Sequence, residues 1–251
     1  MAAAERLDVA LVQRALAPSR ERAQALVAAG LVEVDGARAL RVSQRVGDGA
    51  AVRVVGRDHP WVSRGGVKLD AAIEAFGVSC IERVCLDAGA STGGFTDVLL
   101  SRGAALVYAL DVGYGQLDGR LRDDARVLVL DRTNIRTVRA LNGPAPDLVT
   151  LDLSFVSLST VLPNVASLAA GAELIALFKP QFELGRAQVA RGGIVRDETA
   201  AASCLRDLVS WAEQRLGATA LGAPFASPIR GTKGNQEWFI HLRLPPREDD
   251  G

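Results

Sequence analysis

The sequence predicts an α/β protein in which a doubly wound, mostly parallel sheet follows a small α+β unit. From residue 61 to residue 245, short apolar segments alternate with helical patterns, which is the βαβ rhythm of such a sheet. One apolar segment runs through a loop of small residues into a helix, over residues 84–100. The first 57 residues follow another pattern. With 251 residues, 49% of them hydrophobic, the chain can bury one full-sized core and a smaller one.

The N-terminal unit, residues 1–57, is expected to contain two short helices and several short strands. Apolar residues recur at helical spacing over residues 7–16, and Ser19 can cap a second helix that ends near Gly30. Valine-rich strands then alternate with turns up to residue 55. Residues 58–62 have no periodicity and contain a proline, so we expect a linker there.

The second unit, residues 63–245, is expected to alternate strands and helices, with helices at 67–76, between the strands and at 197–216. The last two strands, near 218–223 and 237–244, are expected to close one edge as an antiparallel pair. The polar tail, 246–251, is expected to be disordered. The other predicted strands span 84–87, 106–111, 127–131, 148–153 and 174–178.

The loop after the first of these strands predicts a ligand. Gly89 and Gly93 carry no Cβ, so backbone and ligand can approach closely. A phosphate-binding P-loop needs a lysine after its last glycine, and this loop has none, which disfavours ATP hydrolysis. The spacing also departs from that of dinucleotide sites, and Asp87 suits a cation better than a pyrophosphate. S-adenosylmethionine, a sulfonium without phosphate, fits; the alternative is a surface loop that is simply rich in small residues.

Acidic or basic residues stand at the ends of the predicted strands: Asp87, Asp111, Asp131, Asp152 and Lys179. The carboxyl ends of parallel strands lie at one edge of a sheet, so these side chains are expected to converge. Asp111 follows Asp87 at roughly the 20-residue interval at which an acidic residue reaches a cofactor ribose. We therefore expect Asp111 to bind a hydroxyl; the alternative is an exposed aspartate at a strand end.

Arginine replaces lysine almost everywhere in this chain. Of 29 basic residues only Lys68, Lys179 and Lys233 are lysines. A lysine can lose its proton when desolvated, whereas an arginine effectively cannot, so all three lysines are candidate site residues. Together with Asp152 and Glu237, lysines beside a methyl donor favour deprotonation of a weakly acidic hydroxyl. Nearby carboxylates oppose loss of the lysine proton, and the sequence leaves that balance open.

A contact with nucleic acid would have to come from a local patch, because the formal net charge is zero. Arginines gather at the starts of the two predicted N-terminal helices, among them Arg6, Arg20 and Arg22. Acidic neighbours dilute this charge, so the alternative is an ordinary solvated face.

The motifs resemble two known families. Arg-Leu-Asp, then Leu-Ala-Pro-Ser-Arg-Glu-Arg-Ala, then Ala-Gly-Leu-Val-Glu-Val-Asp-Gly resembles the S4 RNA-binding domain. The rest resembles FtsJ-like ribose 2′-O-methyltransferases and, most closely, the TlyA family of bacterial rRNA methyltransferases, some of which are named haemolysins. The motifs that carry this resemblance are VSRGGVKL at 62–69, DAGASTGGFTD at 87–97, DVGYGQL at 111–117, DLSF at 152–155, FKPQFE at 178–183 and GNQEWF at 234–239.

The resemblance implies a Rossmann-like class I methyltransferase sheet, S-adenosylmethionine as cofactor, and a cytidine ribose of 16S or 23S rRNA, within the 30S or 50S subunit, as substrate. Lys179 would be the base, Lys68 and Glu237 would orient the nucleophile, and Asp152 would lie by the methyl group. Arg64 would join Arg6, Arg20 and Arg22 in RNA binding. The implied cofactor residues are Ser63, Asp87, Gly89, Ala90, Ser91, Thr92, Gly93, Gly94, Asp111, Asp131, Asn134 and Asp152.

Other functions are less consistent with the sequence. A non-catalytic rRNA-binding assembly factor would not need the intact set of two lysines and two carboxylates, and a small-molecule methyltransferase would leave the N-terminal unit unexplained. A membrane-active haemolysin is disfavoured because no apolar stretch approaches the ~20 residues of a membrane span. Without a signal peptide, and with Cys80, Cys85 and Cys204 lacking metal-ligand spacing, we expect a cytoplasmic monomer with reduced cysteines and no metal.

Overall fold

The computed structural model describes residues 4–17, 19–28, 30–55 and 59–247. The chain divides into two compact units, Met1–Pro60 and Trp61–Gly251, and each is described by itself. The first residue of the expected linker and residues 248–251 of the expected tail lie outside the described residues.

The N-terminal unit packs two helices, α1 (Leu7–Gln13) and α2 (Arg20–Ala28), against short antiparallel strands. Ser19 Oγ accepts a hydrogen bond from the backbone N–H of Arg22 at 3.2 Å, as expected of a residue that caps α2. β2 pairs with both β3 and β5, and β1 pairs with β4. The strands are β1 (Glu5–Arg6), β2 (Val32–Val34), β3 (Ala37–Arg38), β4 (Arg45–Val46) and β5 (Val52–Val54).

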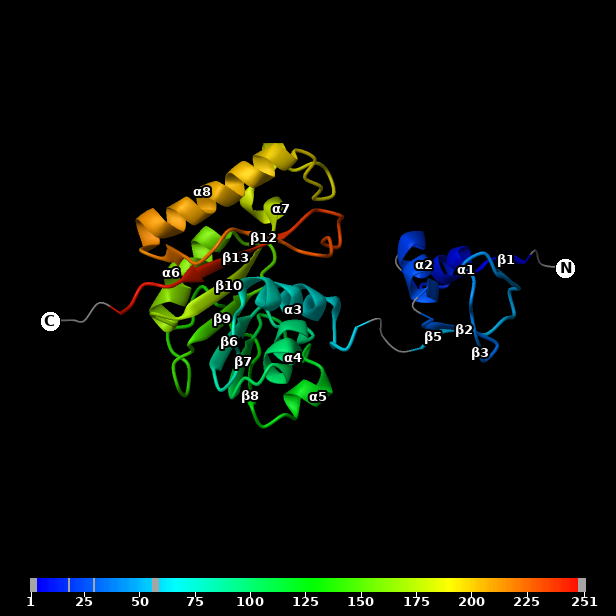
Figure 1. The fold of residues 1–251 in the computed structure, drawn as a ribbon, viewed down its shortest axis with the longest axis horizontal. Coiled ribbons are helices and arrows are strands. Elements are labelled where there is room, and N and C mark those ends of the chain that lie inside the picture. The colour runs from blue at the N-terminus through cyan, green and yellow to red at the C-terminus, as the bar shows by residue number, and fades with distance from the viewer. Residues whose placement is uncertain (1–3, 18, 29, 56–58, 248–251) are drawn as a thin grey trace. The chain divides into compact units, whose positions relative to one another are not determined.

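The second unit is built on a twisted sheet with the strand order β11-β13-β10-β9-β6-β7-β8 (Figure 1). Strands β6 to β10 are parallel, whereas β13 is antiparallel to β10 and pairs with β11 and β12. This is the predicted α/β class with an antiparallel edge. The strands are β6 (Val84–Ala88), β7 (Leu106–Leu110), β8 (Val127–Leu130), β9 (Leu148–Leu151), β10 (Glu173–Phe178), β11 (Thr219–Ala220), β12 (Phe225–Ala226) and β13 (Trp238–Arg243).

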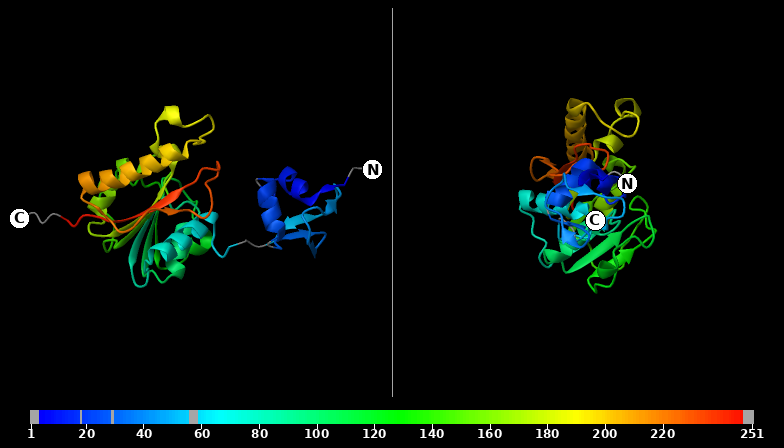
Figure 2. Two further views of the ribbon diagram at one scale, coloured as in Figure 1. Left: turned by 45° about the horizontal axis from the view of Figure 1, so that its top comes forward. Right: turned by 90° about the vertical axis from the view of Figure 1, so that its right-hand side faces the viewer.

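Helices cover both faces of this sheet (Figures 1 and 2). α3 (Arg64–Phe76), α4 (Gly94–Ser101) and the single turn α5 (Gly119–Arg122) bury apolar side chains on one face. α6 (Leu158–Leu168) and α8 (Glu198–Leu216) do so on the other. The short helix α7 (Pro180–Glu183) follows β10 directly. No helix among the described residues is long and apolar enough to cross a membrane.

One expectation about the helices is wrong. The segment between β8 and β9, residues 131–147, contains no helix. Two prolines and Gly143 in its second half oppose helical geometry. The segment is instead held by a side chain of another element: Asn164 on α6 donates hydrogen bonds to the carbonyls of Ile135 and Val138 at 2.7 and 2.9 Å.

Candidate active site

The glycine-rich loop brings the ends of two parallel strands into contact. Gly89 follows β6 with φ +88°, and a Cβ on it would lie 2.4 Å from the carbonyl oxygen of Asp152, which follows β9. Only glycine fits this close approach at a positive φ. Gly93, with φ +95°, precedes α4 and packs against Leu117 and Leu121.

Asp87 lies beneath this loop and not in a cavity. It is fully buried within β6, where its carboxylate accepts hydrogen bonds from Thr96 Oγ1 at 2.7 Å and from Thr150 Oγ1 at 3.3 Å. Burial raises the pKa of Asp87 to about 7. The sequence predicts a cation beside this carboxylate, whereas its side chain lies between the threonines of α4 and β9. Asp87 therefore ties β6 to α4 and β9, the elements that flank the loop.

A cavity of about 440 Å³ opens on one side of the loop. Asp111 lies on its wall, and its two carboxylate oxygens accept hydrogen bonds from the backbone N–H groups of Ser91 at 2.9 Å and Gly113 at 2.7 Å. Asn134 also lines it, whereas Asp131 does not and pairs with Arg122 at 3.1 Å. We call it the adenosine cavity; its lining also includes Gly89, Leu110, Val112, Gln116, Thr133, Ile135, Arg136, Asp152, Leu153, Ser154, Phe155 and Val156.

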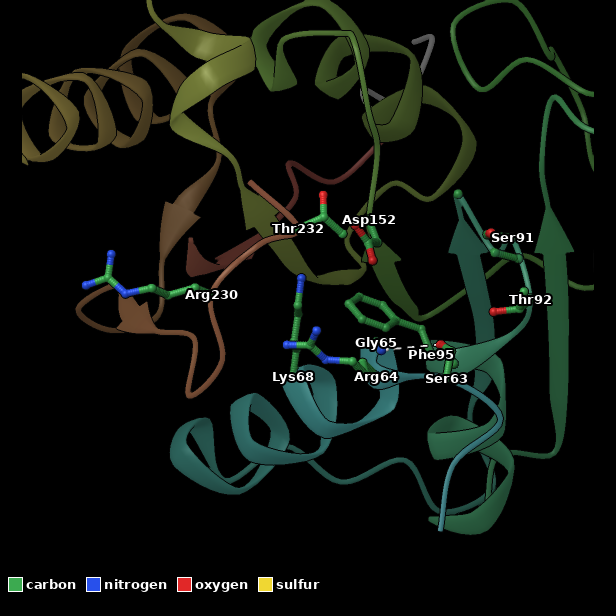
Figure 3. A pocket seen from close by; sticks show the side chains of 13 residues that line it. Ser63, Arg64, Gly65, Lys68, Ser91, Thr92, Phe95, Asp152, Arg230 and Thr232 are labelled. Carbon is green, nitrogen blue, oxygen red and sulfur yellow. Dashed lines mark hydrogen bonds between the residues drawn. The ribbon is translucent and has the colours of Figure 1, made fainter. Parts of the chain in front are cut away.

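A second cavity, of about 220 Å³, lies between the loop and the start of α3 (Figure 3). Ser63 caps α3 by accepting from the backbone N–H of Gly65 at 3.3 Å, and a Cβ on Gly94 would lie 2.2 Å from Ser63 Oγ. Arg64 and Lys68 reach it from α3, and Asp152 faces it from the end of β9. The predicted residues Ala90, Ser91 and Thr92 line it as well.

All three lysines of the chain line a third cavity, of about 490 Å³, which we call the acceptor cavity. Lys68 Nζ donates to Glu237 Oε2 at 2.6 Å. Lys179 Nζ lies 2.5 Å from Asp152 Oδ1 and donates to Ser154 Oγ at 3.3 Å. Lys179 and Glu237 are buried, while Lys233 is exposed. Each buried or half-buried lysine is thus matched by one carboxylate, which makes its burial tolerable.

Asp152 is the meeting point of the site, because it lines all three cavities. Lys68 and Thr232 are shared by the second and third cavities, and Phe155 by the first and third. A ligand bound along the glycine-rich loop and a ligand bound by the lysines would therefore meet at this carboxylate.

Two aromatic residues were not predicted as site residues. Phe155 has 90% of its surface exposed and a φ of +63°, an unusual conformation for a bulky residue, and its ring lies 5.1 Å from that of Phe182. Both line the acceptor cavity. Glu183, the residue after Phe182, links α7 to the start of α6. Its carboxylate accepts hydrogen bonds from Ser157 Oγ at 2.6 Å and from the backbone N–H of Leu158 at 2.8 Å. Phe155 lies in the motif DLSF and Phe182 in FKPQFE, so these two motifs could have indicated the pair from sequence.

In the N-terminal unit, two predicted RNA-binding arginines share one buried carboxylate. Asp8 is fully buried and accepts from Arg6 Nε and from Arg20 Nη2, each at 2.9 Å, and from Gln24 at 3.1 Å. Hydrogen bonding by Arg6 is the main cause of the lowered pKa of Asp8. The arginine side chains remain 40% and 58% exposed, so both stay accessible. Arg22 lies two residues further along α2 and so faces another direction.

The two units match two family models. The FtsJ-like methyltransferase model matches residues 61–244, and the S4 domain model matches residues 5–52. The 16S/23S rRNA (cytidine-2′-O)-methyltransferase TlyA of Mycobacterium tuberculosis is 49% identical over 247 residues, which cover 97% of this chain and 91% of that protein. The chain belongs to the TlyA family of FtsJ-like methyltransferases.

Members of the TlyA family also carry haemolysin names. Hemolysin A of Brachyspira hyodysenteriae is 37% identical over 94% of this chain and 99% of its own length. A solved structure from Streptococcus thermophilus, also named a hemolysin, is 37% identical and covers 100% of this chain and 92% of that chain with a TM-score of 0.76. The family assignment agrees with the resemblance seen in the motifs, and the chain is a methyltransferase.

Proposed function

We propose that this protein transfers a methyl group from S-adenosylmethionine to the ribose 2′-oxygen of a cytidine in 16S or 23S rRNA. The observation that carries the proposal is the junction at Asp152. There, cavities around a glycine-rich loop that lacks the lysine of a P-loop meet a cavity with two lysine–carboxylate pairs. The name of the M. tuberculosis relative supports the choice of cytidine and of ribosomal RNA.

The residues of the loop fit S-adenosylmethionine. Asp111, held by two backbone N–H groups, still has free lone pairs for the hydroxyls of a ribose. Apolar side chains of Val112 and Ile135 suit a flat adenine ring. Asp152 provides a negative charge for a sulfonium, and Ser63 lies with the loop backbone around the second cavity. Bound there, S-adenosylmethionine supplies an electrophilic methyl group.

The protein's own part in the reaction is to prepare the hydroxyl. In its amine form, Lys179 Nζ accepts the proton of the 2′-hydroxyl, and the bonds to Asp152 and Ser154 hold that nitrogen in place. Lys68, fixed by Glu237, directs a positive charge toward the developing oxyanion. Holding the oxygen next to the donor supplies the remaining acceleration through proximity.

We propose that RNA contacts the surfaces around the catalytic residues. The exposed ring of Phe155, packed on the half-buried ring of Phe182, offers a base a stacking surface beside the acceptor cavity. Arg64, exposed at the start of α3, can contact a phosphate. In the N-terminal unit, which we propose spans residues 1–57, the remaining N–H groups of Arg6 and Arg20 serve the same purpose.

The test is transfer of a radiolabelled methyl group to purified 30S and 50S subunits and to their deproteinised RNA. We expect label in 16S rRNA, 23S rRNA or both, at a cytidine located by nuclease mapping. Binding of rRNA without any transfer would instead support the non-catalytic assembly factor. Lysis of red cells by the protein in the absence of transfer would support the haemolysin.

A further inference from the structure

The acceptor cavity has one wall without regular secondary structure. After α7, residues 190–195 form a tight turn in which Gly192 and Gly193 both have positive φ and both line the cavity. Within the turn, the N–H of Ala190 donates to the carbonyl of Ile194 at 2.9 Å. These backbone bonds close the turn on itself but do not attach it to the rest of the site.

Asn235 makes that attachment. Its side chain is only 4% exposed, and Nδ2 donates to the carbonyl of Gly193 at 2.8 Å and to Gln181 Oε1 at 3.1 Å. Its Oδ1 accepts from the backbone N–H of Val195 at 2.9 Å. One buried amide thereby joins the turn to α7 and to the segment that ends in Glu237.

That segment is itself packed against the acceptor machinery. The N–H of Gly231 donates to the carbonyl of Asn235 at 2.9 Å, and a Cβ on Gly231 would lie 2.3 Å from Glu237 Oε1. Thr232, between Gly231 and Asn235 in the sequence, lines the second and third cavities, as do Lys68 and Asp152. The position of the turn is therefore linked through Asn235 to the position of the Lys68–Glu237 pair.

The adenosine cavity has a corresponding asparagine. Asn164 donates to the carbonyls of Ile135 and Val138 and accepts from Arg139 Nη1 at 2.8 Å. It thus holds the segment whose residues 133–136 form a wall of the adenosine cavity, as Asn235 holds a wall of the acceptor cavity. The two asparagines use the same chemistry on opposite sides of Asp152.

We propose that Asn235 is a positioning residue for the RNA: it holds the 190–195 turn as a wall of the acceptor cavity and sets the affinity for the methyl acceptor but not for the cofactor. The inference rests on the proposed function. Removing the amide leaves the carbonyl of Gly193 and the N–H of Val195 without their partner, so the turn moves away from its position.

The experiment compares Asn235→Ala, Asn235→Asp and Asn164→Ala in steady-state methyl transfer, with rRNA and S-adenosylmethionine varied in turn. For Asn235→Ala we expect the KM for RNA to rise about 10-fold and the KM for the cofactor to stay within twofold of the wild type. Asn235→Asp keeps the size and the acceptor for Val195, but it turns a buried carboxylate oxygen toward the carbonyl of Gly193, so it should raise the same constant at least as much as alanine does. Asn164→Ala should show the reverse pattern.

Thermal unfolding of each variant checks that the fold is intact. An equal rise of both KM values in Asn235→Ala, or a fall in kcat alone, would overturn the positioning role. So would a KM for RNA that is unchanged in both Asn235 variants. Absence of transfer by the wild-type protein would instead overturn the proposed function, so the two failures can be told apart.

Discussion

The two sides of Asp152 are built differently. On the adenosine side, the cavity is lined mainly by uncharged side chains, and the carboxylate of Asp111 is held by two backbone N–H groups. On the acceptor side, the cavity contains two lysine–carboxylate pairs. Holding a cofactor needs a fixed surface, whereas moving a proton needs side chains that change charge.

The largest effect is expected at Lys179. Replacement by alanine or arginine should lower the rate of methyl transfer by about 10²–10⁴-fold, because arginine keeps the charge but cannot accept a proton. Cofactor affinity should change less than about threefold. Single-turnover transfer and equilibrium dialysis measure the two quantities, and Lys233→Arg, at the exposed third lysine, is the matched control. Near-normal transfer by Lys179→Arg would remove Lys179 from the role of base.

Asp87 should make the stability of the second unit depend on pH. Its pKa in the folded protein, about 7, is higher than in the unfolded chain, where it is about 3.9. The contribution of Asp87 to the free energy of unfolding is therefore fully present below about pH 4 and is lost as the pH rises through 7. At about 1.4 kcal/mol for each unit of difference between the two pKa values, the loss amounts to a few kcal/mol. Asp87→Asn should lose less stability than the wild type between pH 4 and pH 8.

Urea unfolding at a series of pH values measures this dependence, with the exposed Asp207→Asn as control. Parallel curves for the wild type and Asp87→Asn would show that burial does not raise the pKa of this group.

Gly89 lines the adenosine cavity and packs against the backbone of Asp152, so its substitution should affect both the cofactor and the transfer step. Alanine there would place a Cβ against the carbonyl of Asp152 at a strained φ. We expect cofactor affinity to fall at least about tenfold and the rate of transfer to fall as well. Gly171→Ala is the control, since Gly171 also has a positive φ but nothing within 4 Å of the added Cβ. If only one of the two quantities changed, the loop and Asp152 would not be coupled.

The smallest effect is expected in the N-terminal unit, at Asp8. Asp8→Asn removes a negative charge, which by net charge alone would strengthen RNA binding. If Asp8 holds Arg6 and Arg20 in position, binding should weaken several-fold and the salt dependence should become shallower. Filter binding across a salt series measures both. Asp48→Asn removes the same charge from an exposed position of this unit, and tighter binding by both variants would contradict the role of Asp8.

Much of this site could be predicted from local patterns. The βαβ rhythm predicted the sheet, and the convergence of strand ends predicted that Asp152 and Lys179 would lie together, as they do at 2.5 Å. The scarcity of lysine was the most informative compositional signal, because Lys68, Lys179 and Lys233 all line one cavity.

The rest depended on contacts between distant parts of the chain. The Asp87 side chain is held by Thr96 and by Thr150, and Thr150 lies three strands further along the chain, on β9. The sequence of residues 131–147 does not indicate that this segment is held by Asn164 in place of helical hydrogen bonds. The sequence around Asn235 likewise does not indicate its hydrogen bond to Gly193. Such side-chain-to-backbone bonds are specified by three-dimensional packing and leave little trace in local sequence.

The most direct test of the central claim is the chemical position of the methyl group on the product. After transfer from labelled cofactor, the RNA is hydrolysed in alkali, which cleaves every linkage whose 2′-hydroxyl is free. A methyl group on the 2′-oxygen blocks that cleavage, so we predict label in an alkali-resistant dinucleotide that begins with cytidine. Label released in a mononucleotide would mean methylation of a base, and would contradict the assignment of Lys179 and Asp152 to a ribose hydroxyl.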